Sequence, residues 1–119
     1  MKNKIILIVE DELLIAMFNK QVVEEVGHIV LKTLTNGEDA IEFMKNNTVD
    51  LILMGIMLDG ESDGVQAMEE IRKFSNVPVI YVTGNSNKQV KERAFNTNYS
   101  DFIVKPIAPL KLVEAIELA

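Results

Sequence analysis

The chain has 119 residues, 48% of them apolar and 25% charged, which is the composition of a single folded globular domain spanning residues 1–119. Its net charge is -6 and its 12 basic residues are scattered, so neither nucleic acid nor an anionic membrane surface is expected as a partner. It has no cysteine and no apolar run long enough to cross a bilayer, so we expect a cytoplasmic protein without disulfides.

Short apolar runs alternate with longer amphipathic stretches along the whole chain. The runs predict five strands, at residues 4–10, 28–34, 49–55, 77–84 and 101–105. The stretches predict five helices, at residues 11–27, 36–47, 63–74, 87–96 and 110–119. In the first helix Leu13, Leu14 and Met17 fall near helical spacing, whereas the fourth helix is polar and is expected to be loosely held.

This alternation predicts an α/β fold with a doubly wound, five-stranded parallel sheet. Residues 5–9 and 51–54 are apolar throughout, as strands covered on both faces are. With right-handed crossovers the expected strand order is 2-1-3-4-5, a flavodoxin-like three-layer sandwich with five helices. In that order a functional site lies beyond the carboxyl ends of the first and third strands.

Polar residues stand at most of these strand ends. Glu10 and Asp11 follow the first strand, Gly55 ends the third, Thr83 the fourth and Lys105 the fifth. Adjacent carboxylates suit a hard cation such as Mg²⁺, while a hydroxyl and an ammonium suit the outer oxygens of a phosphoryl group. Taken singly, Asp11 could be a helix N-cap, Thr83 a turn residue and Lys105 a surface charge. These residues are expected to lie together at the edge formed by the carboxyl ends of the strands, which we call the rim. Their common place there favours a functional site.

Over essentially its whole length the chain resembles the receiver domains of two-component response regulators. The resemblance is carried by four stretches: "ILIVEDE", "DLILM" leading to position 55, "VPVIYVTG" and "DFIVKP". The resemblance implies a phosphorelay signalling module rather than an enzyme. It implies a histidine kinase or a phosphotransfer protein as a partner at the rim. It also implies a downstream protein at the surface of the fourth helix, fifth strand and fifth helix, and a monomer or weak dimer.

The resemblance also assigns roles at the rim. It implies that Glu10 and Asp11 hold Mg²⁺ together with the backbone carbonyl of Met57. Thr83 and Lys105 are then the groups that contact the phosphoryl oxygens.

Two further features follow from the resemblance. Phe102 is implied to be a switch residue that turns inward when Thr83 moves. The peptide between Lys105 and Pro106 is implied to be cis, which aims Lys105 into the site.

The sequence departs from the family at Gly55, where receiver domains have the phosphoacceptor aspartate. A glycine has no carboxylate to attack phosphorus, so phosphorylation at this position is excluded by chemistry. Mg²⁺ binding is expected to be weakened, and the domain is expected to fold at least as well as an aspartate form because like-charge repulsion is relieved. Asp59, on the loop that follows, is not expected to fold back and replace the acceptor.

Two origins and two roles stay open. Gly55 is either a substitution in a working receiver or part of a natural module. In the second case the chain is a phosphate-independent pseudo-receiver acting as a protein–protein interaction domain. A Mg²⁺-dependent phosphatase on a similar sheet is disfavoured, since it needs a nucleophilic carboxylate at a strand end.

Overall fold

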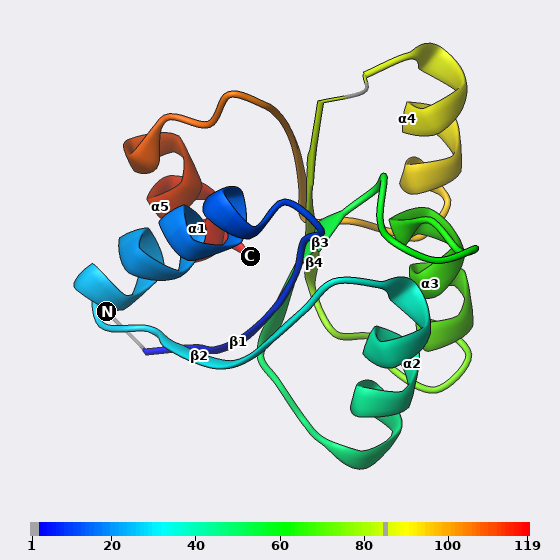
Figure 1. Cartoon of the computed structure of the whole chain (residues 1–119), viewed down its shortest axis with the longest axis horizontal. Helices are drawn as coiled ribbons and strands as arrows, with labels where there is room; N and C mark the ends of the chain where they lie inside the picture. Colours follow the sequence, from blue (N-terminus) through cyan, green and yellow to red (C-terminus); the bar gives the residue numbers. More distant parts are fainter. Residues whose placement is uncertain (1–2, 85) are drawn as a thin grey trace.

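The computed structural model describes residues 3–84 and 86–119 and contains one five-stranded sheet. All strand pairs are parallel and the order is β2-β1-β3-β4-β5, as the alternation of elements predicts (Figure 1). The strands are β1 (Ile5–Val9), β2 (Ile29–Leu34), β3 (Leu51–Gly55), β4 (Val79–Thr83) and β5 (Asp101–Val104). The helices are α1 (Leu13–Glu25), α2 (Gly37–Asn46), α3 (Gly64–Ile71), α4 (Lys88–Phe95) and α5 (Pro109–Leu118).

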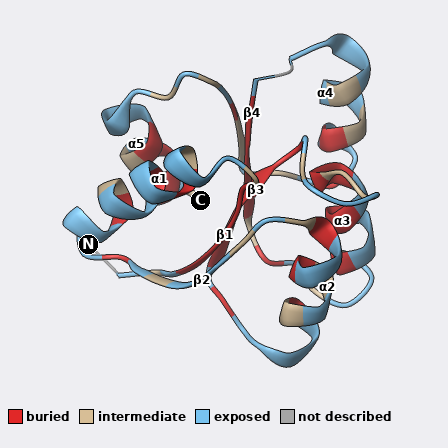
Figure 2. Ribbon diagram, viewed as in Figure 1, coloured by how far each residue is buried: buried red, intermediate tan, exposed pale blue. Residues whose placement is uncertain are grey.

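The helices form two layers around the sheet. Figure 1 shows α1 and α5 on one face and α2, α3 and α4 on the other. Every residue of β3 and β4 is buried, and Figure 2 shows the burial concentrated in the strands and on the inner sides of the helices. Each face therefore has its own apolar core, and the sheet separates them.

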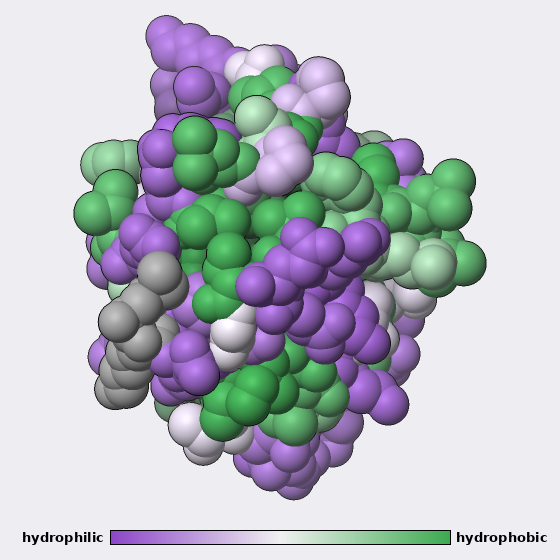
Figure 3. Space-filling model, turned by 90° about the vertical axis from the view of Figure 1, so that its left-hand side faces the viewer, coloured by the Kyte–Doolittle hydropathy of each residue, from purple (hydrophilic) through white to green (hydrophobic). Residues whose placement is uncertain are grey.

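Helix α1 buries a different face from the one that its large apolar residues suggest. Leu13, Leu14 and Met17 are exposed, and the buried positions are Ala16, Asn19 and Val23. Small side chains at spacings of three and four residues let the helix pack closely on the sheet, and the larger residues are left outside. Figure 3, which shows the face carrying α1 and α5, has apolar side chains gathered on its surface.

Helix α3 begins at a close approach between two backbone segments. Asp63 is its N-cap and accepts a hydrogen bond from the Gln66 N–H, while the Gln66 side chain accepts one from the Asp63 N–H, which completes a capping box. The Gly64 N–H donates to the Ile56 carbonyl at 2.8 Å. A Cβ at Gly64 would overlap the carbonyl oxygen of Gly55, so this turn requires glycine.

Helix α4 is weakly buried, as its polar sequence indicates. Ala94 is its only buried residue among those described, and Val90 packs against the core from the same helix. Arg93 ties it to the neighbouring helix of the same layer by pairing with Asp63 at the start of α3. Among the described residues no helix is both long and apolar enough to cross a membrane.

Candidate functional site

The site lies at the carboxyl ends of the strands, where Lys105 meets two acidic side chains. Its Nζ is 3.1 Å from Oε1 of Glu10, donates to Oε2 of Glu10 at 3.3 Å, and donates to Oε1 of Glu12 at 3.1 Å. Lys105 directly follows β5, whereas Glu10 and Glu12 follow β1, so the pairing joins two strands that are not neighbours in the sheet. The Lys105–Pro106 peptide is cis, as the family resemblance implies.

Glu10 is the buried centre of this arrangement. Only 2% of the residue is exposed, and one carboxylate oxygen, Oε2, accepts the Glu12 N–H at 3.1 Å. Burial raises the pKa of Glu10, against the opposing effects of that hydrogen bond and of Lys105. Burial alone would lower the pKa of Lys105, but its hydrogen bonds to Glu12 and Glu10 outweigh burial and raise it. Each of the two groups therefore favours the charged form of the other.

The acidic residues form a group that can bind a metal. One carboxylate oxygen from each of Glu10, Asp11 and Glu12 lies within 4.8 Å of the others. Oε1 of Glu10 is buried and, among the described residues, receives no hydrogen bond of acceptable geometry. A buried oxygen with a spare lone pair beside two further carboxylates fits Mg²⁺, which prefers oxygen ligands. The site would position the ion and use its charge to offset that of a phosphoryl group.

Glu12 belongs to this group although sequence reasoning named only Glu10 and Asp11. The signal was the unbroken acidic run from residue 10 to residue 12. The alternative role for Asp11, as a helix N-cap, is wrong. The N-cap of α1 is Glu12, and its side chain makes no capping hydrogen bond.

The other predicted residues line a cavity beside the acids. A space of about 200 Å³ is bordered by Asp11, Met57, Thr83 and Lys105, so residues at or just after the ends of four strands converge. Thr83 is buried, and its carbonyl accepts the Lys105 N–H at 2.8 Å, which fixes the two residues relative to each other. Met57 is exposed at the cavity edge.

Gly55 lies on β3 next to Glu10. In the sheet Val9 pairs with Met54 and Gly55 pairs with Val82, so the acids after β1 and Thr83 at the end of β4 flank the end of β3. A Cβ built on Gly55 would lie 3.1 Å from Cδ2 of Leu58, 3.2 Å from the Val9 carbonyl oxygen and 3.6 Å from Oε1 of Glu10. A side chain at this position would thus point toward the acidic group, with Leu58 crowding its base.

Phe102 lies on β5 beside α4. It is half-buried, and its ring centroid is 5.8 Å from that of Tyr99 and 6.1 Å from that of Tyr81. Nζ of Lys91, on α4, lies 5.6 Å from the same centroid. Phe102 therefore contacts both the core and the helix above it.

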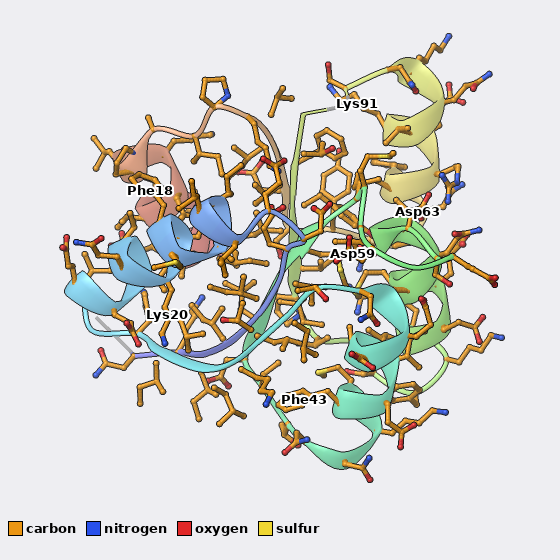
Figure 4. The ribbon with its side chains drawn as sticks, in the orientation of Figure 1. Phe18, Lys20, Phe43, Asp59, Asp63 and Lys91 are labelled. Atoms are coloured by element: carbon orange, nitrogen blue, oxygen red, sulfur yellow. The ribbon has the colours of Figure 1, made fainter. Side chains whose placement is uncertain are left out.

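Asp59 belongs to the loop after β3, and its backbone contacts the loop after β2. Its backbone N–H donates to the Thr35 carbonyl at 3.2 Å, which pairs the loop after β3 with the loop after β2. Its carboxylate is exposed and is not one of the grouped acids among the described residues. Figure 4 shows Asp59 and Asp63 in the segment that leads from β3 into α3.

Comparison with known proteins agrees with this geometry. The model of the response regulator receiver domain matches residues 6–117. The chain belongs to this family. A receiver domain of this kind is a signalling module of two-component systems, in which response regulators interact with histidine kinases or phosphotransfer proteins, and such domains typically bind Mg²⁺ at an acidic cluster.

Three similar proteins illustrate the range of the family. The receiver domain is 37% identical to the transcriptional regulatory protein YvrH of Bacillus subtilis, over 98% of this chain and 48% of that protein. It is 32% identical to the chemotaxis protein CheY of Thermotoga maritima, over 96% of this chain and 95% of that protein. The signal receiver domain of a modulated diguanylate cyclase from Desulfovibrio desulfuricans superimposes with a TM-score of 0.92 at 32% identity, covering 99% of this chain and 94% of that one. The chain spans about half the length of YvrH.

Proposed function

We propose that this receiver domain is a phosphorelay signalling module in which the phosphoacceptor position is occupied by Gly55. The proposal is supported by the place of Gly55 at the end of β3, where an added Cβ would lie 3.6 Å from Oε1 of Glu10. A carboxylate there would adjoin the acidic group, as an Mg²⁺-assisted nucleophile must. Glycine supplies no such group, so the domain is not phosphorylated at this residue.

The remaining residues would keep the roles implied by the family. Glu10 and Asp11, with the backbone carbonyl of Met57, would hold Mg²⁺. Lys105 and Thr83 would contact phosphoryl oxygens. These residues border or adjoin one cavity, and Lys105 has to leave Glu10 and Glu12 before it can contact another anion.

A downstream protein partner would bind at the surface formed by α4, β5 and α5. Phe102 would act as the switch, since it contacts Tyr81 in the core and Lys91 on α4. The weak burial of α4 supports a surface that moves. A histidine kinase or phosphotransfer protein would approach the rim at the strand ends.

A second candidate is a phosphate-independent protein-interaction domain. One observation favours it: the charge of Lys105 is already neutralised by Glu10 and Glu12, so the rim has a stable arrangement without any acceptor. In that case partner binding would not differ between this protein and its Gly55→Asp variant, with or without a phosphodonor.

Intact-mass spectrometry after incubation with Mg²⁺ and a small phosphodonor tests the proposal. We expect a phosphoryl mass on the Gly55→Asp variant and none on the parent chain. No gain on either protein would overturn the assignment of the site and favour the interaction domain. A gain on the parent chain would show that another residue, such as Asp59, accepts the phosphoryl group.

A further inference from the structure

Glu12 occupies a position that the family roles leave unused. Its Oε1 shares the Lys105 ammonium with Glu10, and its carboxylate stands in the same 4.8 Å group as Glu10 and Asp11. Its side chain is 60% exposed, so it can turn toward the rim without unpacking the core. The residue that directly follows the two implied ligands therefore offers a third carboxylate.

We propose that Glu12 is a carboxylate ligand of the divalent cation at this rim, in place of the side chain missing at Gly55, and that Lys105 holds the same carboxylates when no cation is bound. The inference rests on the proposed metal site but not on phosphoryl transfer.

The surroundings of the Glu10 carboxylate support a cation at this position. Oε2 of Glu10 accepts the Glu12 N–H, which fixes the carboxylate and holds Glu12 beside it. Oε1 is buried and receives no hydrogen bond of acceptable geometry from the described residues. A buried carboxylate oxygen is costly unless a cation meets it, and in this structure the Lys105 ammonium is that cation. The oxygen available to a metal is thus the one nearest to the ammonium, at 3.1 Å.

The charges at the rim favour a divalent ion. Three carboxylates face one ammonium, so the group keeps a net negative charge. A divalent cation neutralises more of that charge than Lys105 does, and it prefers several oxygen ligands at once. Metal and ammonium compete for the same oxygens of Glu10 and Glu12, so removing the ammonium should tighten metal binding.

Carbon NMR of the side-chain carboxylates during a Mg²⁺ titration of the unmodified chain tests the ligand set directly. We expect the carboxyl resonances of Glu10, Asp11 and Glu12 to move together along one saturable curve. Movement of Glu10 and Asp11 with Glu12 unchanged would overturn the inference and leave the proposed metal site intact. If none of the three moves at saturating Mg²⁺, both the metal site and the inference are wrong.

Variants provide a second, independent measurement, with Mn²⁺ as the probe and the free ion quantified by electron paramagnetic resonance. Glu12→Gln should weaken Mn²⁺ binding by about fivefold or more, since site affinity follows the number of charged ligands. Lys105→Met should tighten it. Glu24→Gln, which removes an exposed charge from the same helix α1, is the matched control and should change binding by less than about twofold. Equal effects of Glu12→Gln and Glu24→Gln would overturn the inference.

Discussion

Arg93 of α4 donates two hydrogen bonds to Asp63, the residue that caps α3, with Nη1 to Oδ2 at 3.0 Å and Nη2 to Oδ1 at 3.2 Å. The two-pronged geometry holds the planar guanidinium and carboxylate in a fixed relation. Because α4 has one buried residue among those described, this pair is a main tether between α4 and the neighbouring helix α3. It connects the segment after β3 to the surface proposed for output.

Replacing the two partners separately should give unequal losses of stability. Asp63→Ala removes the cap, the capping box and the ion pair, and should lower the free energy of unfolding by about 1–3 kcal/mol. Arg93→Gln removes only the ion pair, which is partly exposed, and should cost less than about 1 kcal/mol. Urea unfolding of the two variants and of the double variant measures both the losses and their coupling.

Lys73→Gln is the matched control for this series. Lys73 pairs with Glu70 across the exposed surface of the same region, and its loss should cost less than about 0.5 kcal/mol. Equal stabilities for Asp63→Ala and Lys73→Gln would contradict the structural role assigned to Asp63.

Substitutions at Gly55 should separate crowding from charge. Asparagine and aspartate have the same size, and both meet Leu58 at their base, but only aspartate adds a negative charge beside Glu10. We expect Gly55→Asn to be more stable than Gly55→Asp by about 1 kcal/mol without metal, because like charges repel in a partly buried site. The Gly55 parent should unfold at a temperature no lower than Gly55→Asp.

Magnesium should reverse part of this order. An additional carboxylate near Glu10 and Asp11 raises metal affinity, so saturating Mg²⁺ should stabilise Gly55→Asp more than the parent or Gly55→Asn. Thermal unfolding of the three proteins with and without Mg²⁺ is the measurement. A metal-free Gly55→Asp protein that melts above the parent would show that repulsion at this position is not significant.

The sheet and the rim could be predicted from the sequence because both depend on local patterns. Continuous apolar runs mark strands covered on both faces, and parallel strands place all their carboxyl ends on one side. Glu10, Thr83 and Lys105 were therefore assigned to one site from their positions alone, and the structure brings them to it.

The missed features depend on distance in the sequence or on close packing. The pairing of Arg93 with Asp63 spans 30 residues and has no local signature. Periodicity located α1 but not its buried face, because the helix packs on the sheet through Ala16, Asn19 and Val23 and leaves the larger Leu14 exposed. The place of Glu12 in the site depends on Lys105, which lies 93 residues away in the sequence and pairs with both Glu12 and Glu10.

Tyr81 should make stability depend on pH in the alkaline range. Its ring is fully buried, and burial raises its pKa from 10.0 to about 12, with an opposing effect from the hydrogen bond to Thr97. The folded state therefore favours the neutral phenol. This contribution is fully present below about pH 10 and is lost as pH rises toward about 12, by about 2–3 kcal/mol in total.

The Tyr81→Phe variant isolates this effect from lysines that titrate in the same range. The difference in unfolding free energy between parent and variant should be constant below about pH 10 and should move in favour of the variant above it. The tyrosinate absorbance of the parent should contain a late step that the variant lacks. A pH-independent difference would mean that Tyr81 ionises as readily in the folded state as in the unfolded chain.

Replacing Gly64 and Gly84 by alanine should give very unequal losses of stability. A Cβ at Gly64 would overlap the carbonyl oxygen of Gly55 and lie 2.9 Å from Cγ of Met54, whereas one at Gly84 would meet no described atom within 4 Å. Because backbone cannot yield as a side chain does, Gly64→Ala should cost about 3 kcal/mol or more, and Gly84→Ala less than about 0.5 kcal/mol. Chemical denaturation of both variants measures this. A loss below about 1 kcal/mol for Gly64→Ala would mean that the loop after β3 moves away from Gly55 at little cost, and so does not hold the end of that strand in place.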